Sequence, residues 1–596
     1  MTRDGGADAR GPAPAPGDGV DADIRRGRRS IEAAALGRSA ALSVALSVAL
    51  SVVTAGQSHA TEARPAPAAP PPAASDCARL AGMVVPAARI GLPSGDARVD
   101  DAAPVEAVAA GASMRPDRSP APALPAYCRV LGQIAPLDPA APPIRFRLNL
   151  PLAWNGRALQ FGGSGFNGVL VDGLGEVPSA PLDTPPPLAR GYATYGTDSG
   201  HAALPGQPPQ AFALNDEAFV NFAYASYKKV RDVAGALIAA HYGRAASRVY
   251  YVGSSEGGRE GLAMAQRFPA DFDGVFARVP VIAWTGLMVA HNRVGVALDG
   301  GGWLNPAKTA LVERATLAAC DAADGLADGI VSRYEGCGSR FSPLALRCPG
   351  GRDAGDHCLS DAQVLAVNTL REPVEFPSPL AHGVTIYPGF GHGGEAGPGG
   401  WLRWWTGPHP PHHPARADDS RQWWYGSGTV RYVFARNAEH DSRNFHPRHY
   451  APRLQQVSAL IDATDPDLSA FHARGGKLIV LEHSADYAQS FLAGVNWWKS
   501  MQARLGAATV ERFARLYVAP GADHSGDGVP RGVDLLWVLE GWVERGEAPG
   551  DLTQVTQEPA PPHAVTQSRP LCRYPAYPRY RGGDPNRAAS FRCEPL

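Results

Sequence analysis

The chain has 596 residues, which is enough for a large hydrophobic core and more than one domain. It carries 56 Lys and Arg against 57 Asp and Glu, a formal net charge of -1. It has no basic stripe and no acidic tail, so we expect no nucleic-acid partner.

The first 60 residues have the pattern of an export signal. Basic residues, including Arg28 and Arg29, precede an apolar segment at 39–55, and Ser58 and Ala60 mark a cleavage site. The apolar segment is short of a full membrane span, which disfavours an uncleaved anchor. The sequence therefore predicts a signal peptide over 1–60 and a secreted or periplasmic protein without stable membrane insertion after cleavage. The export route, Sec or twin-arginine, and the oligomeric state stay open.

After an Ala/Pro-rich linker at 61–76, strands alternate with helices up to about residue 284. The expected strands are 144–150, 157–161, 192–197, 249–252 and 274–279, and the expected helices are 216–242 and 258–267. The pattern resumes with strands 477–481 and 513–518 and helices 491–505 and 532–544. This alternation predicts a mostly parallel sheet covered on both faces.

Residues 285–455 interrupt the alternation. They are rich in Trp, Pro, Gly and His and show little periodicity. Their position predicts a domain inserted over the carboxyl edge of the sheet, here called the lid. The sheet domain is then divided into 77–284 and 456–596.

A nucleophile elbow is predicted at Ser255. The apolar run 249–252 leads directly into Gly-Ser-Ser-Glu-Gly at 253–257, and a helical pattern follows. Strand, tight turn and helix are the context in which this pentapeptide presents a reactive serine in an α/β-hydrolase fold. The N–H of Glu256 would lie at the helix N-terminus, where it suits an oxyanion.

An acid and a base follow in the order that this fold requires. Asp486 lies just after the strand 477–481, and His524 lies just after the strand 513–518. Asp523 is a rival acid, but a sequence neighbour rarely reaches Nδ1 of its own histidine. His483 is a rival base with a weaker position. The expected catalytic set is Ser255, His524 and Asp486.

A glycine-rich segment at 162–168 follows an early strand. Its alternative interpretation is a flexible turn. Its place before the elbow favours a second oxyanion donor, for which we choose the N–H of Gly163.

A cluster of carboxylates lies in the lid at 321–330. Asp321, Asp324 and Asp328 are spaced by small residues in a pattern that suits a hard cation but differs from the EF-hand loop. A solvated Asp/Gly turn is the alternative. If a metal binds, a structural Ca²⁺ far from the chemistry is the expected ion.

All eight cysteines lie after the predicted cleavage site, and their number is even. In an oxidising compartment this indicates disulfides. No pair has C-x-x-C spacing. Pairing neighbours along the chain is the simplest of many possible connectivities.

The chain from about Cys77 onward resembles the tannase/feruloyl esterase family, which includes mono(2-hydroxyethyl) terephthalate hydrolases. The matching segments lie at 162–168, 197–201, 241–243, 255–259 and 266–274. The resemblance implies a secreted esterase for aromatic acid esters, with a lid that binds calcium through Asp321, Asp324 and Asp328 and the carbonyls of Leu326 and Ile330. It also implies the disulfides Cys77–Cys128, Cys320–Cys337, Cys348–Cys358 and Cys572–Cys593.

Two positions depart from the family pattern. The family has cysteines at the positions of Ser254 and Ser525, so the chain is interpreted as a variant without an active-site disulfide and with a looser histidine loop. The family also has a different residue order before the triad acid, so Glu482 or His483 is expected to line the substrate pocket.

The expected function is hydrolysis of feruloyl, galloyl or terephthalate monoesters. Lid aromatics are candidates to cover the acyl ring, with packing in the lid core as the alternative: Trp401, Trp404, Trp405, Trp423, Trp424 and Tyr425. We expect Trp405 and Trp424 to contact substrate. An esterase or acyltransferase for other small esters, or a non-catalytic binding protein of the same fold, are the alternatives.

Overall fold

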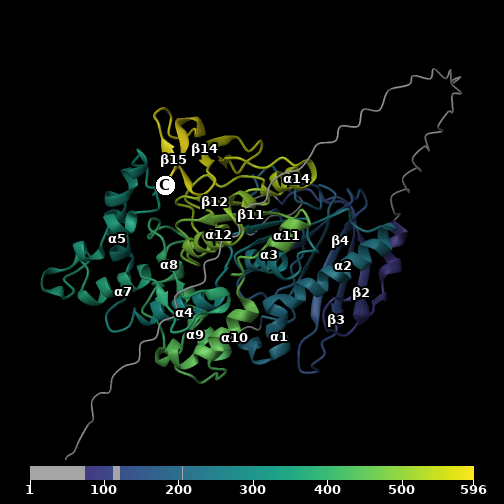
Figure 1. The fold of residues 1–596 in the computed structure, drawn as a ribbon, viewed down its shortest axis with the longest axis horizontal. Helices are drawn as coiled ribbons and strands as arrows, with labels where there is room; N and C mark the ends of the chain where they lie inside the picture. Colours follow the sequence, from purple (N-terminus) through teal and green to yellow (C-terminus); the bar gives the residue numbers. More distant parts are fainter. Residues whose placement is uncertain (1–73, 112–120, 204–205) are drawn as a thin grey trace, which may run out of the picture. The chain divides into compact units, whose positions relative to one another are not determined.

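The structure is a computed structural model that describes residues 74–111, 121–203 and 206–596 (Figure 1). The predicted signal peptide and nearly all of the linker lie outside the described residues. Their assignment therefore stays a prediction. None of the helices in the described ranges is long and apolar enough to cross a membrane.

A mixed sheet forms the centre of the described chain. Its ten strands, in sequence order, are β1 (Val84–Val85), β2 (Ala97–Val105), β3 (Tyr127–Ile134), β4 (Ile144–Pro151), β5 (Arg157–Phe161), β6 (Ala193–Thr197), β7 (Arg248–Ser254), β8 (Gly274–Arg278), β11 (Lys477–His483) and β12 (Ala514–Ala519). Their spatial order is β1-β2-β3-β4-β6-β5-β7-β8-β11-β12. From β6 to β12 neighbouring strands are parallel, whereas β1 to β4 and the β4–β6 pair are antiparallel. The α/β prediction is confirmed, but the sheet is less parallel than expected because β2 and β3 were not foreseen.

Helices cover both faces of the parallel half of the sheet. These are α2 (Ser226–Tyr242), α3 (Glu256–Arg267), α12 (Phe491–Leu505) and α14 (Leu535–Arg545), while the short helices α1 (Asp216–Val220) and α13 (Ala507–Val510) precede α2 and follow α12. A π-helical turn, Asn221–Ala225, joins α1 to α2, so the predicted helix 216–242 is helical throughout. Successive side chains of β7 point to opposite faces. Tyr251 packs with α3 and α12, whereas Tyr250 packs with α14.

Between β8 and β11 the chain builds the segment predicted as the lid, with its flanking residues; α5 and α7 of this segment lie on the opposite side of Figure 1 from β2 and β3. Its elements are α4 (Trp284–Val296), α5 (Pro306–Cys320), α6 (Cys337–Arg340), α7 (Asp361–Arg371), β9 (Val374–Glu375), β10 (Ile386–Tyr387), α8 (Trp401–Trp404), α9 (Arg421–Thr429), α10 (Ala451–Ile461) and α11 (Ser469–Ala473). Little periodicity in the sequence indicates these helices. Helix α4 is buried nearly all round, so it has no polar face and no amphipathic period.

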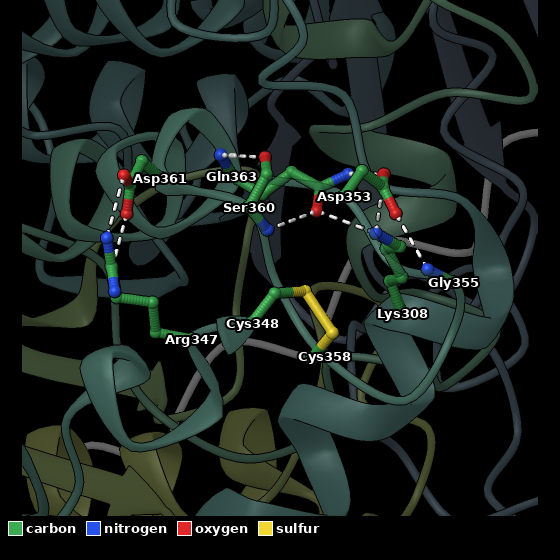
Figure 2. Close-up of a disulfide and its surroundings, with 9 residues drawn as sticks. All are labelled: Lys308, Arg347, Cys348, Asp353, Gly355, Cys358, Ser360, Asp361 and Gln363. Atoms are coloured by element: carbon green, nitrogen blue, oxygen red, sulfur yellow. Dashed lines mark hydrogen bonds and ion pairs between the residues drawn. A yellow bond between two sulfur atoms is a disulfide. The ribbon is translucent and has the colours of Figure 1, made fainter. Parts of the chain in front are cut away.

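Four disulfides pair all eight cysteines as the neighbour pairing and the resemblance implied. Figure 2 shows Cys348–Cys358 in the lid, where Lys308 Nζ donates to Asp353 Oδ2 and Gln363 Oε1, each at 2.8 Å. Each closed loop reduces the freedom of the unfolded chain, which typically stabilises a protein by about 2–4 kcal/mol.

The C-terminal segment forms two small antiparallel sheets that the sequence did not indicate. They consist of β13 (Leu552–Gln557) with β14 (Val565–Leu571) and β15 (Ala576–Tyr580) with β16 (Phe591–Pro595). The disulfide Cys572–Cys593 joins β16 to the residue directly after β14.

Candidate active site

Ser255 lies on a strained turn between β7 and α3. Its φ of 61° and ψ of -121° are unfavourable for a residue with a Cβ atom. Hydrogen bonds hold this conformation: the Ser255 N–H donates to the Arg278 carbonyl at 2.9 Å, and the Gly258 N–H donates to the Ser255 carbonyl at 3.0 Å. The predicted elbow is therefore present as strand, turn and helix.

Two glycines of the elbow are required by close backbone contacts. A Cβ atom on Gly253 would lie 2.1 Å from the Gly257 carbonyl oxygen, and one on Gly257 would lie 2.6 Å from the Gly163 carbonyl oxygen. Glycine at these positions lets strand, helix and the 162–168 loop approach one another.

His524 and Asp486 meet at the carboxyl ends of β12 and β11. His524 Nδ1 lies 2.7 Å from Asp486 Oδ2, and the Asp486 side chain is fully buried. Asp486 Oδ1 accepts the N–H groups of Ala488 at 2.7 Å and Gln489 at 3.2 Å. A carboxylate only accepts hydrogen bonds, so this contact places the proton on Nδ1 and leaves Nε2 of His524 as a base.

One cavity of about 540 Å³ contains both Ser255 and His524. Its wall includes residues of the glycine-rich loop, α4 and the lid, among them Phe166, Trp284, Trp404 and Tyr425. No hydrogen bond joins Ser255 Oγ to His524 within the described structure, and such contacts are often long before substrate binds. His291 also lines the cavity, and burial lowers its pKa to about 3, so this imidazole is neutral.

Of the two backbone N–H groups expected to bind the oxyanion, only one lacks a hydrogen-bond acceptor within the described chain. The Glu256 N–H is in the first turn of α3 and donates to no acceptor among the described residues. The Gly163 N–H instead donates to Glu260 Oε2 at 2.9 Å. Glu260 also accepts Asn167 Nδ2 and the Tyr251 hydroxyl, both at 2.8 Å. The buried carboxylate thus organises the glycine-rich loop and occupies the N–H that the sequence suggested for the oxyanion, which corrects that expectation.

Glu482 and His483 do not line the cavity, contrary to expectation. Both are buried: Gln489 Nε2 donates to Glu482 Oε2 at 2.7 Å, and His483 Nδ1 lies 2.6 Å from the Asp523 carbonyl. Burial raises the pKa of Glu482 well above its usual value and lowers that of His483 well below its usual value. Burial thus favours the neutral form of both side chains, and His483 supports the loop that carries His524.

The aromatic candidates divide between cavity and lid core. Trp404 and Tyr425 line the cavity, whereas Trp405 and Trp424 do not. Trp405 is fully buried, and its indole N–H donates to the Val294 carbonyl at 2.9 Å. In each case the residue that lines the cavity is the sequence neighbour of the predicted one, because neighbouring side chains on a helix point about 100° apart.

Arg278 joins the elbow to the histidine loop, and sequence reasoning did not identify it. Its guanidinium donates to Ser254 Oγ at 2.9 Å, to the Ser525 carbonyl at 3.1 Å and to the His524 carbonyl at 3.3 Å. Burial lowers its pKa to about 10, so it remains charged at neutral pH. The interpretation of the chain as a disulfide-deficient variant with a loose loop is not borne out: four disulfides are present, and Arg278 connects the two segments.

The acidic turn folds around its own backbone N–H groups. Asp321 accepts the N–H groups of Asp328 and Gly329, and Asp328 Oδ2 pairs with Arg569 at 2.6 Å. Asp324 is buried, and its Oδ2 has no hydrogen bond of good geometry, although the Ser332 hydroxyl is near. A buried oxygen without a donor fits a cation ligand, whereas the Asp328–Arg569 pair competes with one.

Comparison with known proteins places this geometry in a family. The family described as "Tannase and feruloyl esterase" matches residues 128–594. Mono(2-hydroxyethyl) terephthalate hydrolase of Piscinibacter sakaiensis is 35% identical over 551 residues, covering 84% of this chain and 90% of that protein. An uncharacterized esterase of Agrobacterium fabrum is 34% identical over 539 residues, covering 88% of this chain and 94% of that protein.

A solved structure supports the fold. Feruloyl esterase B from Aspergillus oryzae has a TM-score of 0.70 to this chain at 23% identity, covering 87% of this chain and all of that one. The match to the family extends over most of the sheet domain and the whole lid. The chain is a member of the tannase and feruloyl esterase family of ester hydrolases.

Proposed function

We propose that the protein hydrolyses esters of aromatic carboxylic acids through an acyl-enzyme on Ser255. The observation that carries this proposal is the contact between His524 Nδ1 and the buried Asp486 carboxylate, beside a cavity that also holds the strained Ser255 turn. These are the three groups that nucleophilic ester hydrolysis requires.

In the proposed mechanism Ser255 Oγ attacks the ester carbonyl while His524 Nε2 takes its proton. Asp486 fixes the tautomer of His524 and stabilises the imidazolium that forms. The Glu256 N–H donates to the developing oxyanion. His524 then protonates the leaving alcohol, and a water molecule activated by the same imidazole hydrolyses the acyl-enzyme.

The cavity wall supports an aromatic acyl group. Phe166 packs edge-on against Tyr425 and Trp284, with ring centroids 5.0 and 6.0 Å apart. Trp404 lies beside His524 with centroids 5.2 Å apart. These rings present apolar surface next to the reacting groups, where a flat acyl ring would bind by stacking and edge contacts. A cavity of about 540 Å³ is in the range for small ligands.

A substrate panel tests the proposal. Purified protein is assayed with methyl ferulate, methyl gallate, mono(2-hydroxyethyl) terephthalate and ethyl butyrate, and a fluorophosphonate is used to label the nucleophile. We expect kcat/KM to be highest for an aromatic ester and mass spectrometry to find the label on Ser255. Turnover of ethyl butyrate alone would refute the aromatic assignment, and label on another residue would refute the nucleophile.

Arg403 allows a sharper prediction about the acyl group. It is an exposed cation at the cavity wall, and its guanidinium lies 5.6 Å from the Trp404 ring centroid. For a substrate with a free carboxylate, such as a terephthalate monoester, Arg403→Gln is expected to raise KM about tenfold, because a charge-assisted hydrogen bond contributes about 1.5–3 kcal/mol. Methyl ferulate serves as the uncharged control. An equal effect on both substrates would contradict carboxylate recognition.

Arg278 is expected to position His524. Arg278→Met would remove this donor from the part-buried His524 and Ser525 carbonyls, and a hydrogen bond that involves a charged group contributes about 1.5–3 kcal/mol. We expect kcat to fall about 10–100-fold with little change in KM, because small displacements of a catalytic group cost this much. Arg531→Met is the matched control, since Arg531, which follows His524 along the chain, reaches the Ser525 carbonyl only at 3.5 Å and is half-exposed. Equal losses in both variants would contradict the positioning role.

Calcium binding by the acidic turn is a separate proposal. Asp321, Asp324 and Asp328, with the carbonyls of Leu326 and Ile330, would hold the ion as a structural element of the lid. We expect added Ca²⁺ to raise Tm after chelator treatment, because a ligand that binds only the folded state stabilises it. Asp324→Asn should abolish this rise, whereas Asp356→Asn, in another lid loop, should not. A Tm independent of Ca²⁺ in the wild type would refute the site.

The predicted export signal and the disulfides both favour an oxidising compartment as the location of the protein. Four disulfides form readily in an oxidising compartment, and the predicted cleavage after Ala60 would release the protein there. We therefore propose a secreted or periplasmic enzyme whose mature chain begins at residue 61.

A further inference from the structure

A second group of metal-ligating side chains lies in the lid, in the loop between α8 and α9. Its segment 407–414 reads Gly-Pro-His-Pro-Pro-His-His-Pro. One ligand atom from each of His409, His412 and Asp418 lies within 4.8 Å of the others. The two imidazole rings pack edge to face, with centroids 4.5 Å apart. We call this group the His409 cluster.

The two imidazoles are oriented by partners that fix their protons. His412 Nδ1 lies 3.1 Å from Oδ1 of Asp419, whose side chain is almost fully buried. His409 Nδ1 lies 3.0 Å from the Pro410 carbonyl. A carboxylate and a carbonyl both only accept, so each Nδ1 carries the hydrogen and each Nε2 presents a lone pair. This is the arrangement in which metal-binding histidines are held.

His409 Nε2 needs a partner. It is shielded from solvent and makes no hydrogen bond within the described chain. The nearest acidic oxygen is Asp418 Oδ2 at 3.6 Å. The Asp419 carboxylate is already engaged, because it accepts the N–H groups of His412 at 3.0 Å and Arg416 at 2.7 Å. Asp418 is therefore free to act as a ligand while Asp419 acts as the support.

We propose that the His409 cluster binds a divalent transition-metal ion of the Zn²⁺ class through His409, His412 and Asp418. Two imidazole nitrogens and one carboxylate oxygen are a ligand set that suits Zn²⁺, with a remaining position for water. The set differs from the acidic turn at 321–328, whose oxygen ligands favour a hard cation such as Ca²⁺. The proposal does not depend on the chemistry at Ser255.

The position of the cluster gives the ion a structural role. The loop follows Trp404 and precedes Tyr425, two residues of the cavity wall. The Trp423 indole N–H donates to the His412 carbonyl at 2.9 Å, and His413 Nε2 lies 2.8 Å from Asp299 Oδ1 after the end of α4. A bound ion would hold this loop closed and thereby fix both helices that carry cavity-wall residues.

Zinc titration of the untagged full-length protein tests the site. The protein is stripped with chelator, returned to buffer with Ca²⁺ in excess, and titrated with Zn²⁺ by calorimetry. We expect one equivalent in the wild type and at least a tenfold weaker Kd in both His409→Gln and His412→Gln. Asp419→Asn should weaken binding about 10–100-fold through loss of the supporting carboxylate.

A second histidine pair provides the control. His446 and His449 are also three residues apart in the lid, with ring centroids 5.5 Å apart, and they belong to no group of metal-ligating side chains in the described residues. His446→Gln with His449→Gln should leave the Kd unchanged. Circular dichroism is used to check that each variant folds. A wild-type Kd in His412→Gln, or loss of binding in the control, would overturn the proposal.

Thermal denaturation gives an independent readout. Saturating Zn²⁺ is expected to raise the Tm of the wild type and of the His446/His449 control but not that of His409→Gln or His412→Gln. An equal rise in all four proteins would show that Zn²⁺ binds elsewhere and would also overturn the proposal.

Discussion

Ser255→Ala is expected to reduce kcat for the best aromatic ester by about 10⁶-fold, close to the loss seen when a catalytic serine is removed from a triad enzyme. The residual rate would come from the oxyanion donor and substrate binding alone. KM should change little, because the serine hydroxyl contributes to the transition state rather than to ground-state binding. The measurement is a steady-state assay with a lower detection limit below the expected residual rate.

Ser254→Ala is the matched control for this prediction. It removes a neighbouring hydroxyl from the same turn, and that hydroxyl only accepts a hydrogen bond from Arg278 at 2.9 Å. We expect its kcat to stay within about 100-fold of the wild type, because a hydrogen bond from a charged guanidinium contributes about 1.5–3 kcal/mol. Comparable losses in Ser254→Ala and Ser255→Ala would remove Ser255 from the role of nucleophile.

Asp486→Asn should reduce kcat by about 10⁴-fold, the loss that accompanies the wrong tautomer of a triad histidine. The amide would donate to Nδ1 instead of accepting from it, so the proton would move to Nε2 and His524 could no longer accept one from Ser255. The fold should persist, because the Ala488 N–H can still donate to the amide oxygen at this position. Circular dichroism and Tm check this point.

Asp523→Asn separates the two candidate acids. Asp523 is adjacent to His524, but its Oδ1 accepts the N–H groups of Ser525 and Asp527, each at 2.8 Å. We expect a loss of at most about tenfold, because an amide oxygen can accept the same bonds. If Asp523→Asn were as inactive as Asp486→Asn, the assignment of the acid would be wrong.

Local sequence signals were sufficient for the elements that carry the catalytic candidates. Strands β7 and β11 are continuous apolar runs, and helix α12 has the bounds that its pattern predicts, Phe491–Leu505. The order of Ser255, Asp486 and His524 after β7, β11 and β12 could be predicted because parallel strands bring their carboxyl ends to one edge of the sheet. The four disulfide pairs came from spacing together with family resemblance.

The cavity wall could not be read in the same way. Trp404 and Trp405 have nearly identical local sequence, and only the direction of each side chain on α8 sends one to the cavity and the other to the core. The N–H of Gly163 is occupied by Glu260, a residue 97 positions away. Such contacts depend on tertiary packing, which short-range patterns do not encode.

The sequence by itself determined the chemistry that is available: a serine on a glycine-flanked turn, a histidine and an acid after later strands, and paired cysteines. The glycine-flanked turn follows from local backbone requirements, and the placement of the histidine and the acid follows from the order of the strands. Tertiary structure decided what surrounds that chemistry. Arg278 spans the elbow and the histidine loop, and the His409 cluster forms where a proline-rich loop folds back on itself. The Arg278 contacts join separate segments of the chain, and the His409 cluster depends on how one loop is packed, so no periodicity in the sequence predicts either of them.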